Sequence, residues 1–241
     1  MNVSELLSKL NIKYPFIDAE SWDNIGLQIG DLSTNVDTDK MFVALDVTSE
    51  VLEQVPENSI IVTHHPLFFK GVKSIDNSSY VGKMTTEIIK KGITLICLHT
   101  NYDKHFLNRY FVENILEKEV CEADGGLLFY KEDIDNVSDC LVGLQYDTGA
   151  NKLRFVDSGN IISKIAVCTG SGTSMMSDAK RMGAQLLLTG DVTHHAAIEA
   201  KEIGISLVDI SHFSSEIYFG TDLVEDMGFK MLKQTNPIEE F

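Results

Sequence analysis

The sequence predicts an α/β protein with two domains, and three observations support this prediction. Apolar runs typical of β-strands alternate with stretches of helical period between residues 41 and 117, the pattern of right-handed βαβ crossovers on a largely parallel sheet. From about residue 124, short apolar runs are separated by polar turns containing glycine, a spacing that favours antiparallel strands. Several of the apolar runs lead into histidine or aspartate, at the strand ends where open α/β sheets bind ligands.

The first domain is expected to begin with a short amphipathic helix over 3–10, because Val3, Leu6, Leu7 and Leu10 share one helical face. Residues 21–30 hold the only tryptophan and are compatible either with a turn around a buried aromatic ring or with a site loop. The apolar runs then predict strands over 41–45, 59–63 and 94–98, with helices over 49–55, 81–91 and 106–117.

The second domain is expected to contain strands over 125–130, 141–145, 153–156 and 161–167, and a helix over 175–182. A further run over 185–189 leads into Gly190 and Asp191, and the chain returns with a strand over 206–210 and a helix ending near Met227. The loop 169–174 lacks the lysine of a phosphate-binding loop, so it is either a tight strand-to-helix turn or a phosphate contact. We therefore expect residues 1–121 plus 206–241 to form a metal-binding α/β domain and 122–205 to form an inserted second α/β domain.

The composition narrows the class of protein. The chain has 241 residues, 44% of them apolar, and a formal net charge of -16. A surface this acidic repels phosphate on average, which argues against a nucleic-acid partner. No apolar run approaches the roughly 18 residues of a membrane span, and the amino terminus lacks the basic and apolar regions of a signal peptide. We therefore expect a soluble cytoplasmic protein without a membrane partner.

A metal site is the chemistry that the sequence favours most. Six of the seven histidines follow strand-like runs within a few residues. A single strand-end histidine is most often a hydrogen-bonded structural residue, but several such sets at one sheet edge favour a site. The nitrogen and oxygen donors suit zinc, iron, manganese or cobalt, and a carboxylate can bridge two cations. The candidate ligands are His64, His65, Asp103, His212 and Glu216.

The remaining strand-end histidines are candidates for acid–base work. His99 and His195 are the candidate catalytic residues, because an imidazole beside a metal site can orient a ligand or move a proton. His194 is an alternative for the same role, whereas His105 has the pattern of a surface residue at a helix start.

The ordered motifs of the chain resemble those of the NGG-interacting-factor-three-like proteins, which are often labelled GTP cyclohydrolase 1 type 2 homologues. The resemblance covers nearly the whole chain, in the short form that lacks an extra inserted domain. Ser211 stands where glycine commonly precedes the ligand histidine, and His194 stands where an aromatic residue is common. The motifs are Trp22-Asp-Asn-Ile-Gly-Leu-Gln28, Ala44-Leu-Asp-Val-Thr48, Thr63-His-His-Pro-Leu67, His99-Thr-Asn-Tyr-Asp103, Thr189-Gly-Asp191 with His195, and His212-Phe-Ser-Ser-Glu216.

The resemblance implies a fold, an assembly and an activity. It implies two interlocked α/β domains with mixed sheets, a toroidal homohexamer, and two divalent metal ions per subunit bound by the five candidate ligands. It also implies hydrolysis of a nucleotide, GTP, to dihydroneopterin triphosphate and formate. The residues are equally compatible with a metal-dependent phosphoester or cyclic-amide hydrolase, or with a ring-shaped binding protein whose metals do no chemistry.

Overall fold

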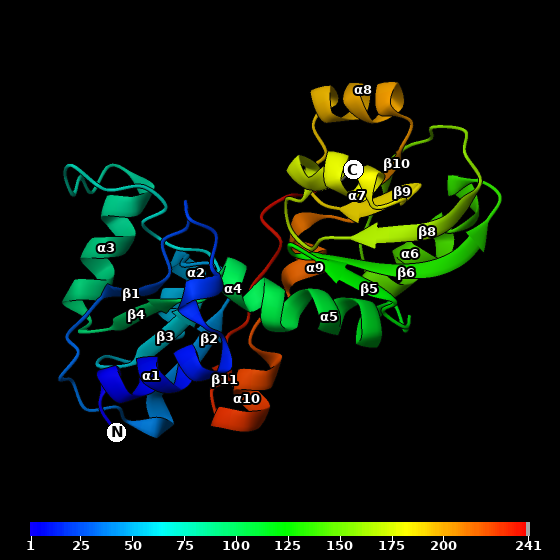
Figure 1. Ribbon diagram of the computed structural model, residues 1–241. Coiled ribbons are helices and arrows are strands. Elements are labelled where there is room, and N and C mark those ends of the chain that lie inside the picture. The colour runs from blue at the N-terminus through cyan, green and yellow to red at the C-terminus, as the bar shows by residue number, and fades with distance from the viewer. Residues whose placement is uncertain (240–241) are drawn as a thin grey trace. The chain divides into compact units, whose positions relative to one another are not determined.

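The computed structural model describes residues 1–239, and the chain forms two compact α/β units, each with its own mixed sheet (Figure 1). The first unit comprises Met1–His105 and Phe219–Thr235. The second comprises Phe106–Tyr218, with residues 236–239 at the end of the described chain. The α/β prediction with two mixed sheets is confirmed.

The sheet of the first unit has five strands in the order β1-β4-β3-β2-β11. The four strands from β4 to β11 run parallel, and β1 pairs antiparallel with β4. Each of the three central strands is fully buried, as their unbroken apolar runs predict. The strands are β1 (Gly26–Ile29), β2 (Met41–Ala44), β3 (Ile60–Thr63), β4 (Thr94–Cys97) and β11 (Lys230–Met231).

Helices cover both faces of this sheet. α2 (Ser49–Glu53) and α3 (Tyr80–Lys90) pack their buried apolar residues against one face, where Phe42, Ile61 and Leu95 belong to the same core cluster. Figure 1 shows α1 (Val3–Lys13) and α10 (Thr221–Met227) on the other side of the sheet from α3. Asn2 caps α1 through a reciprocal pair of hydrogen bonds with Glu5. Short 3-10 turns occur at Phe16–Asp18 and Thr38–Lys40.

The chain passes from the first unit to the second within one helical segment. In it, α4 (Thr100–Tyr102) and α5 (Asn108–Tyr110) alternate with π-helical stretches at Asp103–Leu107 and Phe111–Ile115. Irregularities of this kind in helices are frequent at functional sites. The candidate ligand Asp103 begins the first π-helical stretch.

The sheet of the second unit has six strands in the order β5-β6-β8-β9-β10-β7. β8, β9 and β10 are parallel neighbours, and the other pairings are antiparallel. One face packs against the Phe111–Ile115 stretch and α6 (Leu141–Thr148), and the opposite face packs against α7 (Met176–Arg181) and α8 (His194–Ile203). The strands are β5 (Glu122–Asp124), β6 (Leu127–Ile134), β7 (Arg154–Val156), β8 (Ile162–Val167), β9 (Leu186–Thr189) and β10 (Ser206–Asp209).

The structure corrects the predicted domain boundaries. The segment 106–121 belongs to the second unit, because Phe111, Val112 and Leu116 are buried in the core beneath the second sheet. β10 and α9 (His212–Glu216) also belong to the second unit, because β10 pairs with β9 along its whole length. The division at 121/122 and 205/206 is therefore replaced by one at 105/106 and 218/219.

Two local predictions also need correction, and one of the two alternatives for residues 21–30 is excluded. Residues 141–145, predicted as a strand, lie in the helix α6, because a short apolar run does not distinguish a half-buried helix from a strand. The predicted helix ending at Met227 is divided into α9 and α10, with Gly220 at a φ of +82° between them. Trp22 is 56% exposed, which excludes the turn around a buried aromatic ring.

Among residues 1–239, no helix combines the length and apolar character needed to cross a bilayer.

Candidate metal centre

Three histidines gather at the carboxyl end of the first sheet. β3 and β4 are adjacent and parallel, with Thr63 opposite Cys97, so the residues that follow both strands emerge at the same edge. His64 and His65 follow β3, and His99 follows β4. Their ring centroids are 5.0 to 5.6 Å apart, and each ring offers a nitrogen within 4.8 Å of the others. We refer to these three residues as the histidine cluster, a group of donors that could hold a metal ion.

His64 is fully buried and its ring orientation is determined by its neighbours. Its Nδ1 donates a hydrogen bond to the carbonyl oxygen of Leu98 at 3.0 Å. The ring of Phe219 packs 4.9 Å away between centroids. His64 Nε2 lies 3.3 Å from Asp103 Oδ1, so two of the predicted ligands are brought together within this unit.

Aspartates orient the other two histidines of the cluster. His65 Nδ1 donates to Asp46 Oδ1 at 2.9 Å, and His99 Nδ1 donates to Asp23 Oδ1 at 2.9 Å. Asp23 also accepts hydrogen bonds from the backbone and the hydroxyl of Thr100. Burial opposes ionisation of Asp23, but the hydrogen bonds and charge of His99, together with Thr100, lower the pKa of Asp23 to about 2. Asp23 is therefore an anion that holds the His99 ring in place.

The second unit has its own group of donors at the end of its parallel strands. Thr189 of β9 lies opposite Asp209 of β10, so the residues after both strands emerge together. His212 Nδ1 bonds to Asp191 Oδ2 at 2.6 Å, and His212 Nε2 lies 2.9 Å from Glu216 Oε2, one helical turn away. Burial opposes protonation, but Glu216 and then Asp191 raise the pKa of His212 to about 9.

A glycine makes room for the Glu216 carboxylate. Gly170 follows β8 with a φ of +65°, and a Cβ at this position would lie 1.9 Å from Glu216 Oε1. The Gly170 amide donates to Ser215 Oγ at 2.9 Å, and the Gly172 amide donates to Thr189 Oγ1 at 2.7 Å. The amides of Gly170 and Gly172 therefore bond within the protein, as expected of a tight strand-to-helix turn, and are not available to a phosphate.

The four oriented histidines share one chemical feature. In each, Nδ1 faces a carbonyl or carboxylate oxygen, which can only accept a hydrogen bond, so Nδ1 carries the proton in the neutral ring. In the neutral ring the lone pair is then on Nε2, the nitrogen that a metal ion would take. Glu216 and Asp191 favour the protonated form of His212, so a metal ion would bind there in place of the Nε2 proton. Imidazole and carboxylate donors without a thiolate fit zinc, iron, manganese or cobalt.

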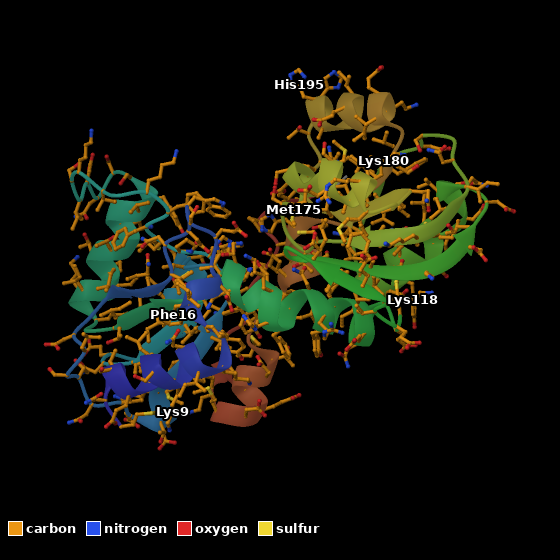
Figure 2. All side chains as sticks on the ribbon, viewed as in Figure 1. Lys9, Phe16, Lys118, Met175, Lys180 and His195 are labelled. Carbon is orange, nitrogen blue, oxygen red and sulfur yellow. The ribbon has the colours of Figure 1, made fainter. Side chains whose placement is uncertain are left out.

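His195 lies outside both groups of donors. It is exposed in the first turn of α8, where Thr193 caps the helix, and Figure 2 shows it at the outer surface of the second unit. Its ring contacts that of His194, with centroids 5.7 Å apart. Of the two candidate catalytic histidines, His99 is the one that the structure brings to other site residues.

Sequence reasoning missed the orienting aspartates. Asp23, Asp46 and Asp191 each lie within one of the family motifs, but the sequence patterns do not predict them as site residues. The available signal is their position, because Asp46 and Asp191 follow strand ends and Asp23 adjoins the only tryptophan.

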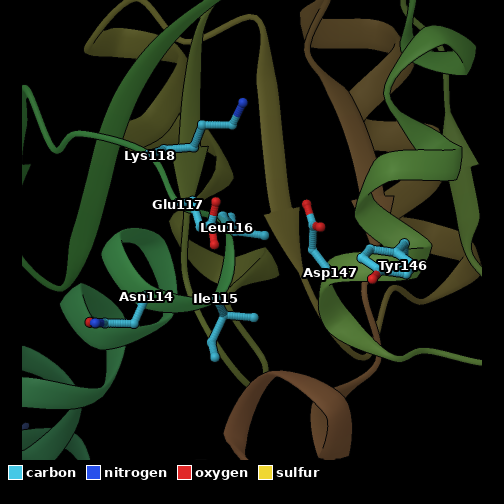
Figure 3. Close-up of a pocket in the computed structure, with 7 residues that line it drawn as sticks. All are labelled: Asn114, Ile115, Leu116, Glu117, Lys118, Tyr146 and Asp147. Atoms are coloured by element: carbon cyan, nitrogen blue, oxygen red, sulfur yellow. The ribbon is translucent and has the colours of Figure 1, made fainter.

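A separate cavity of about 620 Å³ lies within the second unit (Figure 3). It is formed where the helical segment ends and the chain passes near α6, and Figure 3 shows Asp147 opposite Leu116 and Glu117. Tyr146 on its rim is 88% exposed. The cavity is lined by Asn114, Ile115, Leu116, Glu117, Lys118, Tyr146 and Asp147, so it contains none of the predicted site residues.

Comparison with known proteins agrees with this architecture. The family model Duf34/NIF3 (NGG1p interacting factor 3) matches residues 1–239. The chain is 37% identical to the "GTP cyclohydrolase 1 type 2 homolog" of Campylobacter jejuni over 94% of this chain and 92% of that protein. It is also 37% identical to the "GTP cyclohydrolase 1 type 2" of Helicobacter pylori strain 26695, over 92% and 90% of the two chains. The crystal structure of Staphylococcus aureus protein SA1388 matches with a TM-score of 0.83 and 25% identity, over 100% and 99% of the two chains. The chain therefore belongs to the Duf34/NIF3 (NGG1p interacting factor 3) family.

Proposed function

We propose that this protein is a hydrolase that binds two divalent metal ions through His64, His65, Asp103, His212 and Glu216. The observation that carries the proposal is the set of Nδ1 hydrogen bonds, because it leaves the Nε2 lone pair of each ligand histidine directed away from its orienting oxygen. The family resemblance supports the same five residues. Imidazoles and carboxylates in this number leave coordination positions for water, which catalytic sites need and structural zinc sites lack.

The residues of the site would have different roles in hydrolysis. Divalent ions, when bound, lower the pKa of water and offset the charge of a phosphate. His99 lies in the histidine cluster but is not among the five ligands, and Asp23 determines its ring orientation. We assign proton transfer to His99. His195 remains a second candidate, and its exposure on α8 makes the comparison of the two variants informative.

The proposed substrate is GTP, opened at the imidazole ring of guanine to give formate and, after rearrangement, dihydroneopterin triphosphate. The support is the name shared by the relatives from Campylobacter jejuni and Helicobacter pylori. The net charge of -16 repels a triphosphate, so bound cations would be needed to reverse the local field.

We also propose the homohexamer that the resemblance implies, and light scattering at low micromolar concentration tests it. A clean monomer mass would contradict the hexamer.

Metal analysis tests the ligand assignment. We expect about two divalent ions per chain in the wild type, and fewer in Asp103→Ala and Glu216→Ala. His105→Ala is the matched control, because His105 pairs with Asp18 and is not a proposed ligand. An unchanged metal content in both ligand variants would refute the assignment.

Activity assays test the reaction. Metal-loaded protein is incubated with a panel of nucleotides, and pterin fluorescence, formate and phosphate are followed separately. Pterin and formate from GTP, with turnover lost in His99→Ala and retained in His195→Ala, would support the proposed reaction and the role of His99. Phosphate without pterin would identify a phosphohydrolase. No product with any metal would favour the alternative of a binding protein whose metals are structural.

A further inference from the structure

Two aromatic rings stand exposed beside the histidine cluster. Trp22 is 56% exposed and Phe69 is 48% exposed, and their ring centroids are 5.6 Å apart. They come from different loops, one before β1 and one after β3. Two adjacent exposed rings indicate a binding site more strongly than scattered apolar side chains do, because contiguous apolar surface marks binding sites. We refer to Trp22 and Phe69 as the aromatic pair.

Hydrogen bonds hold the two loops together. The side-chain amide of Asn24 donates to the carbonyl oxygen of Phe68. The Phe68 amide donates to Gln28 Oε1 at 3.1 Å, and Gln28 Nε2 donates to the carbonyl oxygen of Asn24 at 2.8 Å. Asp23, next to Trp22, bonds to His99 and Thr100. The aromatic pair therefore rests on a cross-linked support, which reduces the entropy lost when a ligand binds to it.

The aromatic pair also borders the proposed catalytic histidine. The Trp22 ring meets the His99 ring edge-on, with centroids 6.1 Å apart and an angle of 74°. The Phe69 ring does the same at 6.4 Å and 72°. His99 in turn contacts His64 and His65. A planar group resting on the aromatic pair would thus lie next to the group that moves protons.

We propose that the aromatic pair is a stacking platform for the purine ring of the substrate. This inference rests on the proposed function and identifies the part of the site that recognises the base. Stacking on an aromatic side chain accepts any planar base, so the platform would supply affinity and position while other contacts select guanine. Its loss should weaken base binding roughly 5- to 150-fold.

The single tryptophan makes a direct binding test possible. Trp22 is the only tryptophan in the chain, so intrinsic fluorescence reports on the platform itself. Metal-free protein is titrated with guanosine, GTP and tripolyphosphate. We expect guanosine and GTP to quench the emission and tripolyphosphate to leave it unchanged. Use of metal-free protein and a nucleoside without phosphates separates stacking from metal binding.

Variants at Phe69 test whether the aromatic face matters. Phe69→Leu keeps an apolar side chain but removes the ring, and should weaken guanosine binding at least fivefold, whereas Phe69→Tyr should retain it. Phe155→Leu is the matched control, because Phe155 is 49% exposed on β7 of the second unit. Circular dichroism verifies that each variant folds.

The outcomes distinguish the platform from the reaction. Guanosine quenching that Phe69→Leu weakens supports the platform even if no pterin forms. Pterin formation with no response of Trp22 emission to any base, and with an unchanged KM in Phe69→Leu, overturns it. An emission that changes with protein concentration but not with guanosine also overturns it, because a second copy of the chain would then cover the aromatic pair.

Discussion

Replacing Asp222 by alanine should destabilise the first unit strongly, because this buried carboxylate satisfies three donors. It accepts hydrogen bonds from the hydroxyls of Tyr14 and Tyr102, the latter at 2.6 Å, and lies 2.7 Å from Lys13 Nζ. Burial first, and then the charge of and hydrogen bonding to Asp222, raise the pKa of both tyrosines, so both remain donors at neutral pH.

The expected loss follows from the groups left without an acceptor. Each buried hydroxyl without a partner costs about 1 to 3 kcal/mol, so the two tyrosines together account for about 2 to 6 kcal/mol. Lys13 can still pair with Asp226, which lies 2.6 Å away. We therefore expect Asp222→Ala to lower the free energy of unfolding by about 3 to 5 kcal/mol.

Urea unfolding followed by Trp22 fluorescence measures this change, because Trp22 belongs to the same unit as Asp222. Asp226→Ala is the matched control, since Asp226 contacts the same lysine but is 61% exposed, and should cost less than about 1 kcal/mol. Equal losses in the two variants would refute the argument from burial.

Three further predictions concern the neighbourhood of the site. Gly170→Ala and Gly149→Ala both place alanine at a φ of +65°, which should cost about 1 kcal/mol in Gly149→Ala and more than that in Gly170→Ala, and only Gly170→Ala should lower metal content, because its Cβ would collide with Glu216. Equal metal content in the two would contradict this. Ser211 has a φ of +67°, so Ser211→Gly should stabilise the protein by about 0.5 to 1 kcal/mol in thermal unfolding, and a lower melting temperature would count against backbone strain there. Because the pKa of Asp23 is lowered from 3.8 to about 2, its ionised form contributes stability that is present above pH 3.8 and lost as the pH falls towards 2. Asp23→Asn should lack this acid-dependent loss of stability. If the free energies of unfolding of wild type and Asp23→Asn fall equally between about pH 4 and pH 2, the contribution assigned to Asp23 is refuted.

Much of the fold is predictable from local patterns. The runs 41–45, 59–63, 94–98 and 206–210 form the expected strands because continuous apolar residues suit strands buried on both faces. Local patterns fail where burial is partial. Residues 141–145 form a helix instead of a strand, and β1 and β11 were not expected, because these short segments take their conformation from the strands they pair with.

The sequence predicts which metal-binding residue types follow the strands, but it does not predict which of these residues contact one another. Histidine after an apolar run and an aspartate or glutamate one helical turn away are local features, so the candidate donors were predictable from spacing. The orienting pairs join residues that are distant in the sequence: His65 and Asp46 are 19 residues apart, His212 and Asp191 are 21 apart, and His99 and Asp23 are 76 apart. These pairs depend on which strands become neighbours, and strand order arises from the burial of whole sheet faces rather than from any local pattern. The same holds for the unit boundary, because only the packing of Phe111 and the pairing of β10 with β9 assign 106–121 and 206–218 to the second core.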